Sequence, residues 1–164
     1  MMKSDKDKLL RIMQYNFLAD RLCTIKRYPH AKEFVRQFEW RGPMIMEEIK
    51  QADCDIVCVQ ELDRAADFYI EQFTNLGYNV LHESRPSILI KKEGLAIAYK
   101  RDKIELLKSE SIDMSDLKNI YGNEFSKTNQ ARLCLFRHVL TGFVFVVANC
   151  HLYFDARVDF VRFA

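Results

Sequence analysis

The feature of this sequence that most constrains its fold is the short run Asp55-Ile56-Val57-Cys58-Val59-Gln60-Glu61. Its continuous apolar, β-branched character predicts a strand that is buried on both faces. The run ends abruptly on an amide and a carboxylate. A carboxylate held at the rigid end of a buried strand suits a hard cation such as Mg²⁺, although Glu61 is also interpretable as the first solvated residue after a strand.

Two other apolar runs also end on polar residues. Three such strand ends in one chain favour a ligand-binding site over chance. Residues 9–15 lead into Asn16, and residues 143–148 lead towards His151. An amide at a strand end can orient a metal ligand or a phosphate oxygen, although a turn-forming asparagine is the simpler interpretation of Asn16 alone. If the three strands are parallel neighbours, Asn16, Glu61 and His151 converge on one rim of a sheet.

Composition narrows the class of protein. The chain has 164 residues, which is about one domain, and its net charge of +2 does not indicate an unusually basic nucleic-acid-binding protein. Its five cysteines are odd in number and lack C-x-x-C spacing, so we expect reduced, mostly buried thiols. No run approaches the roughly 18 apolar residues of a membrane span, and no signal or transit peptide is recognisable. We expect a cytoplasmic or nuclear protein with no membrane partner.

The hydrophobic pattern predicts seven strands, at 9–15, 55–60, 78–82, 94–100, 104–112, 129–138 and 143–149. The last of these is the most apolar and is expected to lie in the middle of a sheet. Residues 94–112 are expected to form a β-hairpin. Because several strands are apolar on both faces, covering layers are needed, and a layered α/β (α+β) sandwich is the economical architecture.

About four helices complete the predicted fold. Residues 31–40 form the first, and Gly42-Pro43 is expected to interrupt it, so that Pro43 begins a second helix. Asp63 to Leu76 is the third, with Asp63 as its N-cap and Gly77 as its stop signal. Residues 155–164 have the apolar spacing of a fourth.

Four stretches occur in a fixed order along the chain, at 13–20 (MQYNFLAD), 55–63 (DIVCVQELD), 93–100 (EGLAIAYK) and 147–155 (VANCHLYFD). Together they resemble the endonuclease/exonuclease/phosphatase superfamily of DNase I-like fold. The nearest branch is similar to the nocturnin, Angel and carbon-catabolite-repressor deadenylases, with the 2′,5′-phosphodiesterases close by. The resemblance covers nearly the whole chain and implies the first half of a DNase I-like four-layer α/β sandwich.

The resemblance also implies roles for particular residues. Glu61 matches the Mg²⁺ ligand, with Mn²⁺ as an alternative ion, and Asn16 lies beside it to support metal and phosphate. His151 matches the residue that contacts the scissile phosphate, and Asn149 helps to shape the site. The pair Asn129-Gln130 matches a strand entry that lies near substrate in this branch.

The chain departs from the family pattern because the second half of the site has no counterpart in it. The family brings an Asp-x-Asn pair, a late Asp and an Asp-His pair from that half. We therefore expect residues 1–164 to be a partial domain whose C-terminal half is missing, as in a fragment or a truncated gene product, and leave open whether it is an enzyme.

Three functional hypotheses remain open at this stage. The first is a Mg²⁺-dependent phosphodiesterase on RNA, a 3′-exoribonuclease of the poly(A) type, in which a carboxylate-bound metal and a histidine act on the phosphate. The second is a catalytically silent remnant or an interaction protein. The third is a phosphatase or 2′,5′-phosphodiesterase of the same superfamily. The base preference, the linkage and any protein partner are not determined by the sequence.

Overall fold

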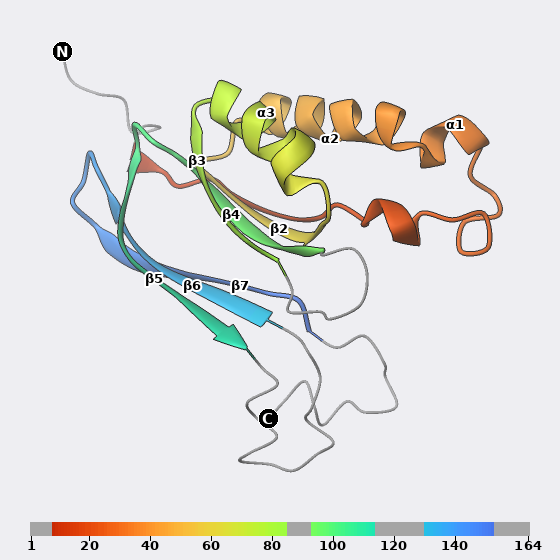
Figure 1. The fold of residues 1–164 in the computed structure, drawn as a ribbon. Helices are drawn as coiled ribbons and strands as arrows, with labels where there is room; N and C mark the ends of the chain where they lie inside the picture. Colours follow the sequence, from red (N-terminus) through yellow and green to blue (C-terminus); the bar gives the residue numbers. More distant parts are fainter. Residues whose placement is uncertain (1–7, 85–92, 114–129, 153–164) are drawn as a thin grey trace, which may run out of the picture.

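The structure is a computed structural model that describes residues 8–84, 93–113 and 130–152. Two β-sheets stack face to face, and helices cover the outer face of the first sheet (Figure 1). The predicted layered α/β class is confirmed. The described residues form its helix, sheet and sheet layers, whereas the expected helix at 155–164 lies outside them. No helix in the described ranges is long and apolar enough to cross a membrane.

The first sheet has four strands in the order β1-β2-β4-β3. Strand β1 pairs parallel with β2, and β4 pairs antiparallel with both β2 and β3. The two central strands, β2 and β4, are buried almost throughout, as the apolar run around residue 57 predicts. The strands span Ile12–Asn16 (β1), Ile56–Leu62 (β2), Tyr78–Ser84 (β3) and Gly94–Lys100 (β4).

The second sheet has three strands in the order β5-β6-β7, all antiparallel. They span Ile104–Asp113 (β5), Gln130–His138 (β6) and Val144–Cys150 (β7). The predicted hairpin over 94–112 is wrong, because β4 and β5 belong to different sheets. The expectation that 143–149 lies in the middle of a sheet is also wrong for the described residues. There β7 is an edge strand, and the side chains of Val144 and Val146, on one of its faces, are exposed.

The helices begin and end differently from the prediction in two places. Helix α2 runs unbroken through Pro43, and the expected break falls instead at Gln37, whose backbone is extended. A Cβ on Gly42 would lie 2.8 Å from the ring of Phe38, so glycine lets that buried ring fold against the helix. The helical segments are Asp20–Leu22 (η2), Glu33–Arg36 (α1), Phe38–Ala52 (α2), Ala65–Tyr69 (η3, a π-helical turn) and Ile70–Asn75 (α3).

The third helix confirms one predicted boundary and corrects the other. Gly77 ends it with a φ of +86°, and its N–H donates to the Thr74 carbonyl at 3.0 Å, as a left-handed stop residue does. Asp63 does not cap its N-terminus. The Asp63 carboxylate instead accepts a hydrogen bond from the Asp20 N–H at 2.6 Å, which ties β2 to the turn after β1.

Two hydrophobic cores lie on the two faces of β2, because successive side chains of a strand point to opposite sides. Val57 and Val59 pack into the core under the helices, whereas Ile56 and Cys58 pack into the core between the sheets. This alternation continues to Gln60, whose buried amide is thereby directed between the two sheets.

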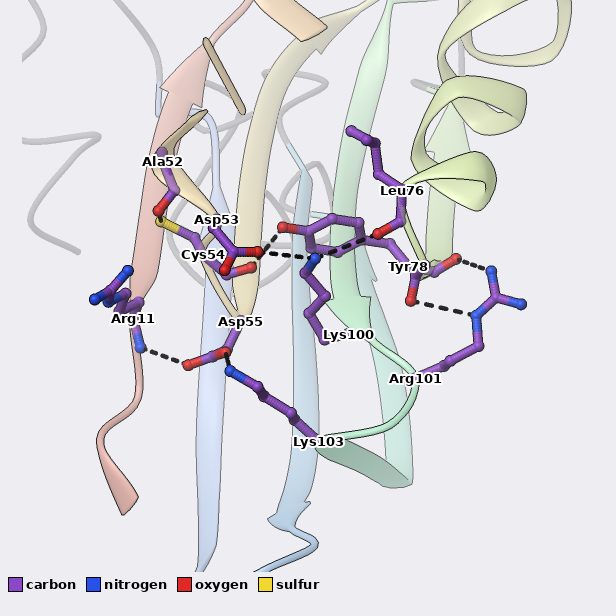
Figure 2. A network of polar contacts seen from close by, with 11 residues as sticks. Arg11, Ala52, Asp53, Cys54, Asp55, Leu76, Tyr78, Lys100, Arg101 and Lys103 are labelled. Carbon is purple, nitrogen blue, oxygen red and sulfur yellow. Dashed lines mark hydrogen bonds and ion pairs between the residues drawn. The ribbon is translucent and has the colours of Figure 1, made fainter. Parts of the chain in front are cut away.

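A polar network fixes the starting end of β2 (Figure 2). Asp55 is 1% exposed, and its carboxylate accepts hydrogen bonds from the Arg11 N–H at 2.9 Å and from Lys103 Nζ at 2.8 Å. Asp53 forms an ion pair with Lys100 at 3.0 Å. These contacts join β1, β2 and the β4–β5 turn at the end of the sheet opposite Glu61.

Candidate active site

The carboxylate of Glu61 is held at the end of β2 by an irregular backbone. The pairing of β2 with β4 shifts register between Val59 and Leu62, and Glu61 has a φ of +55°. A bulge of this kind re-aims a side chain, and a left-handed non-glycine residue is costly unless its surroundings hold it. Here Asn16 Nδ2 donates to Glu61 Oε1 at 3.0 Å, and the Ala19 N–H donates to Oε2 at 3.1 Å.

The orientation of Asn16 follows from its own second contact. Its Oδ1 accepts a hydrogen bond from the Leu18 N–H at 2.8 Å, so its Nδ2 is the group left to face Glu61. Leu18 itself has a φ of +57°. The turn after β1 therefore acts as a rigid bracket for the carboxylate.

His151 reaches the same place from the second sheet. Its Nε2 lies 3.7 Å from Glu61 Oε1, so the predicted gathering of Asn16, Glu61 and His151 is present in the structure. The predicted route is wrong in one respect. β1 and β2 are parallel neighbours, but the strand before His151, β7, belongs to the other sheet. The three groups meet because the two sheets stack.

Asn149 lies beneath this rim and joins the two sheets. It is buried, its Oδ1 accepts from Gln60 Nε2 at 2.6 Å, and its Nδ2 donates to the carbonyls of Val59 and Ala96, both at 2.9 Å. Gln60 Oε1 in turn accepts from Gln14 Nε2 at 2.6 Å. A fully satisfied buried network of this kind rigidifies the packing around it. Asn149 therefore holds the end of β2 against β7, whereas its predicted role in shaping the site stays a prediction.

Of the predicted substrate-side pair, only Gln130 can be placed. Its side chain is buried, and Nε2 donates to the Ser84 backbone carbonyl at 3.3 Å. The backbone carbonyl of Gln130 accepts from the His151 N–H at 3.4 Å. It lines a small cavity together with His151, Glu93, Gly94 and Leu95. Asn129 lies outside the described residues.

The sequence of this chain is similar to that of known exoribonuclease subunits. The chain is 30% identical to the Ccr4 subunit of the CCR4-Not complex of Yarrowia lipolytica, a 3′-5′-exoribonuclease, over an alignment of 172 positions. The alignment covers 92% of this chain and 24% of that protein. The Neurospora crassa Ccr4 subunit is also 30% identical, over 93% of this chain and 22% of its own length. The chain belongs to the endonuclease/exonuclease/phosphatase superfamily, in its Ccr4/nocturnin branch.

Solved structures agree with this membership. The crystal structure of ANGEL2, a 2′,3′-cyclic phosphatase, superposes with a TM-score of 0.80 at 25% identity, over 94% of this chain and 44% of ANGEL2. The human Nocturnin catalytic domain with bound sulfate superposes with a TM-score of 0.72 at 22% identity, over 90% of this chain and 51% of that domain. The DNase I-like fold is thereby confirmed. A search with protein-family profiles finds no match.

The match is partial on the side of the relatives. The chain spans about a quarter of the length of the Ccr4 proteins and about half of the superfamily structures.

The described residues at the rim supply only some of the ligands that a hard cation needs. Within the described ranges, no three His, Cys, Asp or Glu side chains gather into a group that could hold a metal ion. Glu61 supplies a single carboxylate, and each of its oxygens keeps acceptor capacity beyond the amide contact it makes. Mg²⁺ is often bound through one or two carboxylates, several waters and the substrate phosphate. The Glu61 donor set fits that mode and does not fit an all-protein cage.

The rim region also holds Glu93, which was not predicted as a site residue, and Gln60, which was noted only as the amide that ends the buried strand. Glu93, at the start of β4, accepts a hydrogen bond from Arg21 Nη2 at 2.5 Å, and Gln60 carries the cross-sheet contact. A buried acidic or amide residue next to an apolar strand was the available signal for both. Burial raises the pKa of Asp63, which lies two residues beyond Glu61. The Asp63 carboxyl therefore takes up a proton more readily than an exposed aspartate does.

Proposed function

We propose that this chain carries the metal-binding part of the active site of a phosphodiesterase that removes nucleotides from the 3′ end of RNA, with poly(A) as its substrate. The observation that carries the proposal is the contact of Asn16 and His151 with one carboxylate, Glu61, at the rim of a DNase I-like fold. Similarity to Ccr4 exoribonuclease subunits supports RNA as the substrate class.

The chemistry follows from the positions of the rim groups. Water attacks the phosphorus of the terminal linkage, the bond from phosphorus to the 3′ oxygen breaks, and a mononucleotide leaves. Glu61 would hold Mg²⁺, with Mn²⁺ as an alternative, and the bound ion supplies Lewis-acid stabilisation of charge on the phosphate oxygens. Asn16 keeps the carboxylate in place. His151 is placed to contact the scissile phosphate or to protonate the departing oxygen.

A direct assay tests the role of Glu61. The chain is incubated with Mg²⁺ and an adenylate oligomer labelled at its 3′ end, and wild type is compared with Glu61→Ala and with Glu105→Ala. Glu105 is an exposed glutamate on β5 that pairs only with Arg137 in the described residues, so it is a matched control. We expect Glu61→Ala to lose activity by about a hundredfold or more and Glu105→Ala to keep it. Equal activity of Glu61→Ala and wild type would reject the proposal.

A second candidate activity has its own support. ANGEL2, whose structure superposes over 94% of this chain, is a 2′,3′-cyclic phosphatase. Presenting the chain with oligonucleotides that end either in a 2′,3′-cyclic phosphate or in a hydroxyl separates the two activities. Opening of the cyclic phosphate without chain shortening would favour the phosphatase, and a 2′,5′-linked adenylate included in the same panel tests the alternative linkage.

We also propose that residues 1–164 form the first part of a larger catalytic domain, since they span 44% of ANGEL2 and 51% of the Nocturnin domain. Sequencing the locus beyond codon 164 tests this. An open frame that encodes Asp-x-Asn and Asp-His motifs supports it, and the activity assay is then run on the longer product. A closed frame together with an inactive chain favours the silent or interaction protein.

A further inference from the structure

Two cavities of similar size flank the rim at Glu61, and they differ in character. The first, here called the α2 groove, has a volume of about 620 Å³ and lies between β1 and α2. The second, here called the acidic pocket, has a volume of about 540 Å³ and includes Asp20, Asp63 and Asp67 in its lining. Both are large enough for a nucleotide-sized ligand. Charge decides which of them suits a nucleic acid.

The α2 groove adjoins the candidate active site through one residue, Asn16. Asn16 lines the groove and also donates to Glu61 at 3.0 Å, so the two share a wall. Arg41 lies at the same end. Its Nη2 donates to the Leu18 carbonyl at 2.6 Å, whereas its Nη1 is buried without a hydrogen-bond partner among the described residues. The buried Nη1 does not itself face the solvent, so Arg41 contributes its positive charge at this end of the groove.

Exposed aromatic and apolar side chains stand at this end of the groove. Trp40 is 50% exposed although it is a large apolar residue, and Met44, one turn further along α2, is also exposed. The ring of Phe34 meets the Trp40 indole edge to face at 5.2 Å, which supports the indole from one side. An exposed, supported aromatic ring beside a cation is the combination with which proteins bind single-stranded nucleic acid.

The charge of the surrounding segment points the same way. Residues 21–41 contain six lysines and arginines against two glutamates, so this segment is basic although the whole chain carries only +2. The acidic pocket presents three carboxylates against one guanidinium, that of Arg64, which pairs with Asp67 at 3.1 Å and with Asp20 at 3.9 Å, so its net charge is still negative and repels phosphates. Glu47 and Glu48 line the α2 groove about two turns beyond Arg41, and Glu48 accepts a hydrogen bond from the Tyr15 hydroxyl at 2.6 Å. A phosphate backbone is therefore favoured only at the Trp40 end.

We propose that the Trp40 end of the α2 groove is a subsite for single-stranded RNA, in which a nucleobase stacks on the Trp40 indole and the adjoining phosphate faces Arg41. The subsite leads the strand to Glu61 past Asn16. It rests on the proposed function for its direction towards the catalytic rim, but binding itself requires no catalysis. Because the two glutamates limit its far end, it holds a short length of strand.

The experiment uses Trp40 as its own reporter, because it is the single tryptophan of the chain. Tryptophan emission is followed during titration with a short oligoadenylate in EDTA, which prevents metal-dependent hydrolysis. An abasic oligomer of equal length serves as the control for phosphate contacts alone. We expect quenching by the oligoadenylate and little quenching by the abasic strand. Binding detected by fluorescence anisotropy of labelled RNA without any change in Trp40 emission would overturn the proposal.

Variants separate stacking from general charge. Trp40→Ala is expected to weaken oligoadenylate binding by about tenfold, whereas Trp40→Phe keeps most of it. Phe143→Ala is the matched control, because Phe143 is an aromatic residue at least as exposed as Trp40 (61% against 50%) that lies outside the α2 groove. Circular dichroism confirms that each variant is folded, and the wild-type quenching decides the matter if one is not. Equal affinity of Trp40→Ala and wild type contradicts the proposal.

The failure of this subsite is distinguishable from failure of the proposed function. If Glu61→Ala loses hydrolysis but RNA leaves Trp40 emission unchanged, the rim is catalytic and the subsite is wrong. If RNA quenches Trp40 but Glu61→Ala is as active as wild type, the subsite stands and the role of Glu61 is wrong. Self-association that shields Trp40 in the absence of RNA, with no response to RNA, would assign the groove to protein contact and overturn the proposal.

Discussion

The carboxylates at the two ends of β2 differ in the contacts that the fold makes with them. At the starting end, Asp55 is buried and satisfied by the fold itself, through the Arg11 N–H and the Lys103 ammonium. At the other end, Glu61 contacts two neutral amide donors and lies 3.7 Å from His151, and within the described residues no lysine or arginine pairs with it. The first arrangement neutralises the carboxylate within the fold and stabilises the start of the strand. The second leaves a negative charge available to a ligand.

The pKa values of neighbouring carboxyl groups follow the same contrast. The hydrogen bond from Lys100 lowers the pKa of Asp53, at the starting end. Burial raises the pKa of Asp63, at the rim. A carboxylate whose charge the fold does not neutralise is typical of a functional site, whereas a paired one is typical of a structural anchor. One strand thus carries an anchor and a candidate active site at its two ends.

Removing each carboxylate is the sharpest way to break this comparison. Asp55→Ala removes a buried carboxylate and leaves the Arg11 N–H and the Lys103 ammonium without their acceptor, so we expect a loss of about 3 kcal/mol in the free energy of unfolding. Glu61→Ala is expected to change stability by less than about 1 kcal/mol, because its contacts lie at the rim. Urea denaturation followed by circular dichroism measures both. Equal losses at the two positions would remove the distinction between anchor and site.

Two glycines sharpen the comparison by a steric argument. A Cβ on Gly94, near the rim, would lie 2.0 Å from the Glu83 carbonyl oxygen across the β3–β4 pair. Gly77, at the other end, needs only its left-handed backbone, since no atom lies within 4 Å of a Cβ placed there. We expect Gly94→Ala to destabilise by about 2 kcal/mol and Gly77→Ala by about 1 kcal/mol, measured by thermal unfolding. The reverse order would show that the strands at the rim separate easily.

The smallest expected effect is a dependence on pH. Burial, together with the nearby Arg132, lowers the pKa of His82, which lines the acidic pocket beside the rim. The folded state therefore favours neutral imidazole, and its stability is fully present above the ordinary histidine pKa of about 6.5 and declines as pH falls below it. Unfolding measured between about pH 7.5 and 5.5 is expected to show this decline, and His82→Gln to reduce it. An unchanged slope in the variant would assign the decline to other groups.

Local pattern was enough to predict all seven strands, because most correspond to an apolar run bounded by polar residues, whereas β5 and β6 show a mixed or alternating pattern. It was not enough to predict which strands pair. The polar turn after Lys100 looks like a hairpin turn, yet β4 pairs with β2 and β3 while β5 pairs with β6. Pairing depends on contacts between residues far apart in the sequence, which alternation does not encode. The same limit applies to the placement of β7.

The gathering of three side chains was predicted, but the way in which the fold brings them together was not. Strand ends and family resemblance together pointed to Asn16, Glu61 and His151, and the structure brings them together. The left-handed backbone of Glu61 and the amide contact between Gln60 and Asn149 were not predicted, since neither residue type signals its conformation or its distant partner. These two features determine where the carboxylate points, and they are visible only in three dimensions.

The most direct test of the central claim is the location of a bound divalent ion. Mn²⁺ is added to the isotope-labelled chain, and the broadening of backbone amide signals is mapped by nuclear magnetic resonance. The account predicts that broadening centres on Asn16, Glu61 and His151 and spares the carboxylates at Asp53 and Asp55, which the fold already pairs with lysines. Broadening centred on Asp53 and Asp55, or shared equally between the two ends of β2, would contradict it.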